Sequence, residues 1–130
     1  MLWPRAGLQP LLSARRPEAL PFVIHCLDRL DAGGLRQRLR PSHIEYMLGH
    51  LHRQVYGGPL LGPEGNTVGS LMVTDHASMT EVEDFLRDEP YARAGLFATV
   101  QIHPLRQMVP EVEAGFLQAE LAREKARAGS

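Results

Sequence analysis

The chain has 130 residues, which is enough for one domain with its own hydrophobic core and leaves no room for a second. Fourteen basic and 15 acidic side chains give a formal charge of -1, so the composition favours neither nucleic acid nor an anionic membrane as a partner. Cys26 is the only cysteine, which excludes an internal disulfide and suits a reducing cytoplasm. No apolar run approaches the roughly 20 residues needed to span a bilayer.

The two ends of the chain differ from its middle. Residues 1–20 contain Trp3, three prolines and three arginines, with Glu18 as the only acid. They lack the continuous apolar stretch of a secretory signal, and we expect an N-terminal extension or loosely docked arm in preference to an organelle transit peptide. Residues 110–130 begin with Pro110, and the apolar spacing after it predicts a short amphipathic helix that docks on its own subunit or on a partner. The domain itself is expected over residues 21–109.

The first half of that domain predicts a strand and a helix. Pro21 to Leu27 is a compact apolar run with β-branched residues at its centre, typical of a buried strand, in which His25 shares a face with Val23 and Leu27. After a polar loop, a helix is expected to begin near Arg40-Pro41-Ser42, because proline suits the first helical turn. Ser42 and Glu45 also fit a capping box there.

The second half predicts a hairpin, a helix and a last strand. Val55 to Leu61 and Val68 to Thr74 have strand character and are joined by a Gly-Pro-rich turn. Ser78 and Glu81 form a capping box ahead of a helix that should end near Pro90. In the run from Leu96 to His103 apolar and polar residues alternate, which indicates a half-buried strand.

The resulting order β-α-β-β-α-β predicts an α+β fold of the ferredoxin-like kind, with two helices on one face of an antiparallel sheet. Such an arrangement leaves the other face of the sheet uncovered. Because a two-fold dimer is the commonest way for a small protein to bury that face, we expect a homodimer.

Several short motifs, in this order and spacing, resemble the YCII-related family, over the stretch from Pro21 to about Gln107. They are His25-Cys26-Leu27-Asp28, Arg40-Pro41-Ser42-His43, Gly57-Gly58-Pro59-Leu60, Gly69-Ser70-Leu71 and Pro90-Tyr91-Ala92-Arg93-Ala94-Gly95-Leu96-Phe97. The resemblance implies small dimeric proteins with a ferredoxin-like fold of the dimeric α/β barrel type.

The resemblance also implies a site at the histidine of the Arg-Pro-x-His motif, here His43, paired with the acid of an Asp-Pro-Tyr motif. This chain departs from the pattern, because Glu89 directly precedes Pro90 and Asp88 stands one residue earlier. Either carboxylate could pair with the histidine. A carboxylate on one ring nitrogen would fix the tautomer and favour the imidazolium formed during turnover, whereas the expected position of His43 in the first helical turn would disfavour that charge.

Five further residues are candidates for ligand binding. His25 could line the same cavity or serve as a core histidine, and the Ser70 hydroxyl could bind a ligand oxygen or stabilise a turn. Tyr91 could offer its hydroxyl or simply pack its ring. Gly58 and Pro59 could leave room for a ligand or constrain the hairpin.

No cofactor motif is present, and the histidines lack the spacing and partners of a recognised metal site, so we expect neither metal nor cofactor. The leading hypothesis is a small enzyme of lyase or isomerase type that uses His43 for proton transfer on a small hydroxylated or cyclic organic compound. The alternative is a non-catalytic dimeric module of the same family that binds a small molecule or a partner protein.

Overall fold

The computed structural model describes residues 20–129 of the chain, so the predicted extension lies almost wholly outside the described residues. The chain divides into two compact units, whose described parts are residues 20–105 and 106–129. The first unit contains, in chain order, β1 (Phe22–Asp28), α2 (Leu35–Leu48), a short 3₁₀ turn (Leu51–Arg53), β2 (Gln54–Leu61), β3 (Thr67–Thr74), α3 (Met79–Asp88), α4 (Pro90–Arg93) and β4 (Phe97–Pro104).

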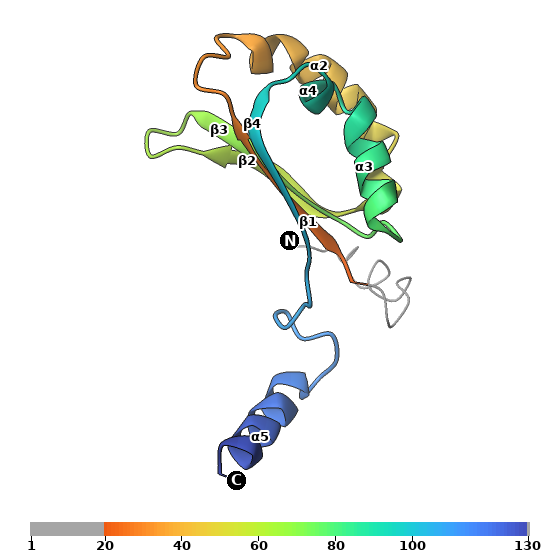
Figure 1. The fold of residues 1–130 in the computed structure, drawn as a ribbon, viewed down its shortest axis with the longest axis vertical. Coiled ribbons are helices and arrows are strands. Elements are labelled where there is room, and N and C mark those ends of the chain that lie inside the picture. The colour runs from red at the N-terminus through yellow and green to blue at the C-terminus, as the bar shows by residue number, and fades with distance from the viewer. Residues whose placement is uncertain (1–19, 130) are drawn as a thin grey trace. The chain divides into compact units, whose positions relative to one another are not determined.

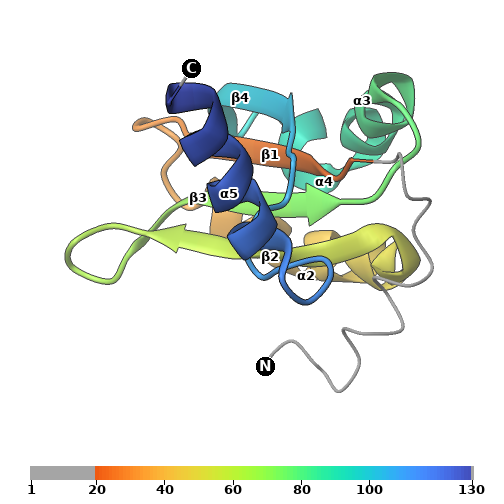
Figure 2. The ribbon, with the colours of Figure 1, turned by 90° about the horizontal axis from the view of Figure 1, so that it is seen from below.

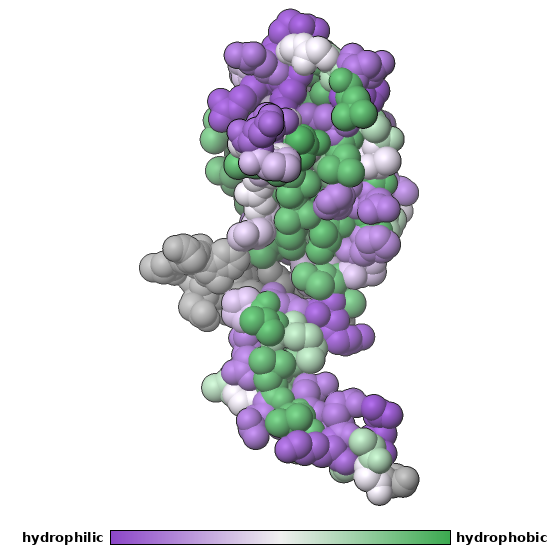
Figure 3. Space-filling view, turned by 90° about the vertical axis from the view of Figure 1, so that its left-hand side faces the viewer, coloured by the Kyte–Doolittle hydropathy of each residue, from purple (hydrophilic) through white to green (hydrophobic). Residues whose placement is uncertain are grey.

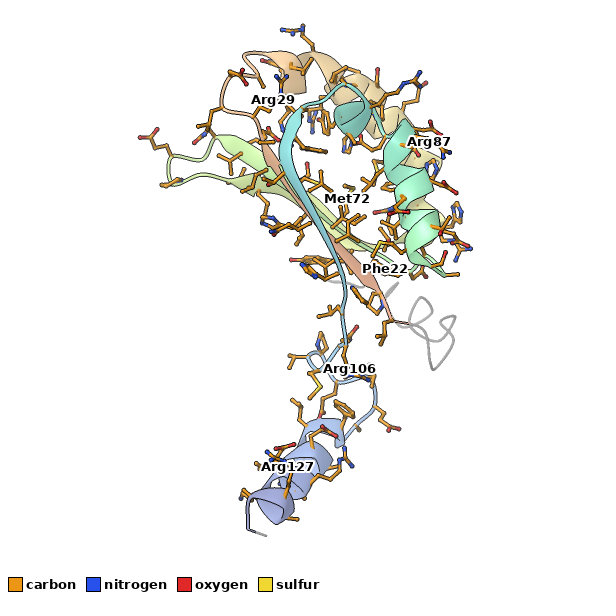
Figure 4. The ribbon with its side chains drawn as sticks, in the orientation of Figure 1. Phe22, Arg29, Met72, Arg87, Arg106 and Arg127 are labelled. Carbon is orange, nitrogen blue, oxygen red and sulfur yellow. The ribbon has the colours of Figure 1, made fainter. Side chains whose placement is uncertain are left out.

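The four strands form one sheet in the order β2-β3-β1-β4, and every neighbouring pair is antiparallel. Helices α2, α3 and α4 lie on one face of this sheet (Figures 1 and 2). The predicted ferredoxin-like α+β fold is therefore confirmed. Phe22 and Met72 point from the sheet toward the helices (Figure 4), where they form a core with Val82 and Phe85 of α3.

The opposite face of the sheet carries the alternate residues of each strand. On β1 these are Val23, His25 and Leu27, which are partly buried or exposed, and Val23 lies opposite Val73 of β3. Figure 3 views the molecule from the left-hand side of Figure 1 and shows hydrophobic side chains gathered over the middle of this unit. The expected face for His25 is thus confirmed, and it is the face turned away from the helices of this unit.

The start of α3 follows its predicted capping box. The Ser78 hydroxyl accepts a hydrogen bond from the backbone N–H of Glu81, and the Glu81 carboxylate accepts one from the N–H of Ala77. The first bond satisfies a donor that has no partner within the first helical turn, and the second holds Ala77, the residue before the N-cap. The helix ends at Asp88, and Pro90 begins the separate short helix α4, as the proline suggests.

The predicted start of the first helix is wrong. Helix α2 begins at Leu35, so Pro41 lies inside it and Ser42 does not cap it. The residues before the proline, Leu-Arg-Gln-Arg-Leu-Arg, have high helix propensity, and they extend the helix toward the N-terminus despite the proline. His43 therefore lies in the middle of α2, where the field of the helix N-terminus no longer disfavours a charged ring.

Strand β2 begins one residue earlier than predicted and lies at the edge of the sheet, where a proline such as Pro59 is tolerated. A Cβ added at Gly57 would lie 2.6 Å from the backbone oxygen of Leu71, so the two strands need a glycine there to approach each other. At Gly58 an added Cβ would meet nothing within 4 Å. The predicted close approach in this motif thus occurs at its first glycine.

The second unit contains α5 (Phe116–Ala128), so a helix does follow Pro110 as predicted. Its preceding residue, Gly115, has a φ of 85°, a conformation that glycine adopts without strain. Leu117 and Leu121 of this helix are exposed, and Arg127 pairs with Glu124 on its surface. Among the described residues, no helix is long and apolar enough to cross a membrane.

Candidate active site

A pocket of about 410 Å³ lies between α2 and the strands β2 and β3. Four of its lining residues occupy one face of α2 at helical spacing: Arg36, Arg40, His43 and Met47. The opposite wall includes Ser70 of β3 and the backbone of β2, and Tyr91 of α4 closes one side. The volume lies within the range of sites that hold one small molecule.

Among the predicted site residues, the structure brings His43, Ser70, Tyr91, Gly58 and Pro59 together around this pocket. His25 lies on the other face of the sheet, and its Nδ1 atom is buried without a hydrogen-bond partner in the described part of the chain. It does not line the pocket.

His43 forms a close pair with Glu89. Its Nδ1 atom lies 2.7 Å from Glu89 Oε2, and the Glu89 side chain is fully buried whereas that of His43 is 19% exposed. Asp88, the other candidate acid, has a side chain 54% exposed and lies 3.6 Å from Arg87 instead. The geometry therefore distinguishes two neighbouring carboxylates that the sequence left equivalent.

The Glu89 carboxylate has a second function at the start of α4. Its oxygens accept hydrogen bonds from the backbone N–H groups of Tyr91, at 3.1 Å, and Ala92, at 3.0 Å. These bonds cap the short helix and partner a carboxylate that would be costly to bury alone. Because all its neighbours are donors, the carboxylate is the acceptor for His43, so that Nδ1 carries the proton and Nε2 is left for a ligand.

Two rings and a guanidinium are stacked beside this pair. The ring centroids of His43 and Tyr91 lie 4.1 Å apart with an interplanar angle of 17°, and the Arg36 guanidinium carbon lies 4.5 Å from the centroid of Tyr91. Tyr91 is only 2% exposed, and burial raises the pKa of its hydroxyl while the charge of Arg36 opposes that rise. Packing against Tyr91 thus holds the plane of the histidine ring, in addition to the hydrogen bond that His43 donates to Glu89.

The position of Arg36 is fixed by two strands. Its Nε and Nη2 atoms donate to the two carboxylate oxygens of Asp28 at 2.7 and 2.8 Å, and Nη2 also donates to the Ser70 hydroxyl at 2.9 Å. Such a bidentate pair is strong and directional. Neither Arg36 nor Arg40 was among the site residues predicted from the sequence. Arg36 precedes Arg40 by four residues and Arg40 precedes His43 by three, so a helix that begins at Leu35 places both arginines on the face of His43.

Cys26 is a core residue without access to the pocket. It is fully buried, and burial raises the pKa of its thiol to about 12. A thiol in this state is a poor nucleophile near neutral pH. In the described part of the chain, no three His, Cys, Asp or Glu residues are grouped so that they could hold a metal ion.

An antiparallel sheet in the element order β-α-β-β-α-β, covered by helices on one face, defines an α+β protein of the ferredoxin-like class, and a histidine-carboxylate pair lies at the pocket of this one. Residues 20–106 match the model of the YCII-related domain, and the chain belongs to the YCII-related family. The resemblance found in the sequence is therefore confirmed.

Among solved structures, the chain is similar to the 5-chloro-2-hydroxyhydroquinone dehydrochlorinase from Burkholderia phenoliruptrix, determined in complex with 2,5-dihydroxybenzoquinone. The two share 25% sequence identity with a TM-score of 0.67, over 71% of this chain and 99% of that one. None of the curated proteins matches the chain. The similar protein thus combines this fold with a dehydrochlorinase activity and a small ring ligand.

Proposed function

We propose that the chain is a small-molecule enzyme of lyase or isomerase type that transfers a proton on a small hydroxylated or cyclic organic compound without a cofactor. The observation that supports it most directly is the 2.7 Å contact between His43 and the buried Glu89, at the wall of a pocket of about 410 Å³. The dehydrochlorinase activity of the similar protein, which is named for a hydroxylated ring substrate, supports the same class of reaction.

In this proposal His43 Nε2 removes a proton from an acidic O–H or C–H group of the substrate. The electron pair left behind forms a new double bond. In an isomerisation another substrate carbon accepts the proton back from the imidazolium, whereas in an elimination a leaving group departs with its electron pair. Glu89 stabilises the imidazolium between these steps and keeps its Nδ1 proton in place.

The other pocket residues would bind and orient the substrate. Ser70 accepts a hydrogen bond from Arg36, so its own O–H remains to be donated to a ligand oxygen. Gly58 and Pro59 present a wall with little side-chain bulk, against which a flat ring can lie. Tyr91 acts mainly through its ring, which lies against His43.

The test is a thermal-shift screen of chlorinated and unchlorinated hydroxyquinols, hydroxyquinones and small lactones, followed by turnover assays on the compounds that bind. We expect product with the wild type and a loss of about 100-fold or more in kcat with His43→Gln. The matched control is His52→Gln, because His52 is exposed and does not line the pocket. Binding that persists in His43→Ala, with no product from either protein, would favour the non-catalytic binding module.

We also propose that the chain forms a homodimer through the outer face of its sheet. Val23, Val73 and Tyr56 are cross-strand neighbours on that face, and Tyr56 is 62% exposed. A second copy would bury this apolar surface. Light scattering coupled to size-exclusion chromatography should give a dimer for the wild type and a monomer for Val73→Glu, and a monomeric wild type would contradict the proposal.

A further inference from the structure

The charges that line the pocket are all of one sign. Helix α2 contributes the arginines Arg36 and Arg40, and the described lining residues include no aspartate or glutamate. Among the described residues, the carboxylate in contact with His43 is that of Glu89, which is buried behind it. A pocket with this lining attracts negative charge.

The two arginines differ in what they already bind. The charge of Arg36 is compensated by two hydrogen bonds to Asp28, and its side chain is only 16% exposed. Its guanidinium therefore has little capacity left for a substrate. Arg36 is best described as part of the wall that positions Ser70 and Tyr91.

Arg40 lies one helical turn later on the same face of α2. It lines the pocket and is exposed, and its side chain has no hydrogen bond or ion pair to any residue in the described part of the chain. Arg40 precedes His43 by three residues in the same helix, so both side chains lie on the face of α2 that lines the pocket. Five N–H donors are thus available at the site of proposed proton transfer.

The shape of the remaining lining favours a flat molecule. Ile44, Met47 and Met72 offer apolar contact, while Gly57, which pairs with Met72, places no side chain on the opposite wall. A single ring fits a volume of about 410 Å³. The combination is an apolar, flat-walled site with one uncompensated cation.

We propose that Arg40 is a specificity-determining residue that selects ring substrates carrying an anionic oxygen, as a carboxylate, phenolate or enolate. This inference rests on the proposed function, since it concerns the substrate of the same site. The guanidinium would bind the anionic oxygen and hold the ring so that His43 Nε2 reaches the proton to be removed. The same contact would stabilise negative charge that develops on that oxygen as the proton leaves.

The test compares two ligands of the same shape, 2,5-dihydroxybenzoate and 2,5-dihydroxybenzamide, by isothermal titration calorimetry. The wild type should bind the anion about tenfold more tightly than the amide, which is the contribution of one charge-assisted contact. In Arg40→Gln the two affinities should become equal within about twofold, mainly through weaker binding of the anion. The preference of the wild type should also shrink as salt is added.

The matched control is Arg38→Gln, which removes the same charge from the same helix at an exposed residue outside the pocket. It should keep the preference of the wild type. Equal affinities in the wild type, failure of either ligand to bind, or a preference that survives Arg40→Gln would each overturn the inference. His43→Gln separates this inference from the proposed function, because the variant should keep the preference for the anion. A wild type that shows this preference but converts no compound would refute the proposed enzyme and leave the role of Arg40 unchanged.

Discussion

Replacement of Glu89 by glutamine tests the pair on which the proposed chemistry depends. The carboxylate accepts three hydrogen bonds: those from His43 and the Tyr91 N–H arrive at Oε2, and that from the Ala92 N–H arrives at Oε1. Glutamine is of nearly the same size, but only one of its two terminal atoms is an acceptor. Whichever way the amide is turned, at least one buried donor then faces another donor.

The expected loss of stability in Glu89→Gln follows from the number of buried donors left without an acceptor. A buried donor left without a partner costs about 1–3 kcal/mol, and in a domain of this size the lower value alone lowers the Tm by about 4 °C or more. The cost to activity has a different origin, because the amide cannot stabilise an imidazolium by charge. We expect kcat to fall by about 100-fold or more.

The assay measures Tm and kcat for Glu89→Gln, Glu89→Asp and Asp88→Asn on any compound that the wild type converts. Glu89→Asp keeps the charge and the helix cap but withdraws the carboxylate from His43 by about 1.5 Å, the length of one carbon-carbon bond, so its kcat should be intermediate. Asp88→Asn, at an exposed neighbour, should change neither quantity. Wild-type kcat in Glu89→Gln, or equal damage from Asp88→Asn, would refute the assigned pair.

Three further measurements test the packing around the site. Cys26, with a thiol pKa of about 12 and no exposed surface, should react with a disulfide reagent at pH 8 only after unfolding, and reaction of the folded protein at the rate of a free thiol would contradict its burial. Burial lowers the pKa of His76, so the unfolded chain binds a proton more readily than the folded one, and the free energy of unfolding should decrease as the pH falls below about 6.5. His76→Gln should make that decrease shallower, and an unchanged slope in urea titrations would be inconsistent with this account. Gly57→Ala places a Cβ 2.6 Å from a backbone oxygen and should lower the free energy of unfolding by about 1–3 kcal/mol. Gly58→Ala places its Cβ in open space and should change that free energy by less than about 0.5 kcal/mol in the same titrations. Equal effects of the two substitutions would argue against the close approach of β2 and β3.

Local patterns were sufficient to predict most of the fold. Strand alternation and the capping box at Ser78 depend on residues a few positions apart, and the structure has those elements within one or two residues of the predicted bounds. The start of α2 was missed because the rule for proline in a first turn competed with the helix propensity of the six residues before it. Because the predicted helix began too late, Arg36 lay outside it and Arg40 lay at its edge. Neither could then be assigned to the helical face that carries His43.

From the sequence, the resemblance to the family pointed to His43 and to Asp88 or Glu89 as its partner, and strand alternation determined which face of β1 carries His25. Only the tertiary structure decided between Glu89 and Asp88, because the turn from α3 into α4 buries the first and leaves the second exposed. It also decided that the pocket lies on the helical side of the sheet, away from His25. The choice of acid and the side of the pocket both depend on how elements distant in the chain pack against each other. That packing determines which polar groups are buried and which of them find a hydrogen-bond partner, and these two quantities carry the free energy of the choice.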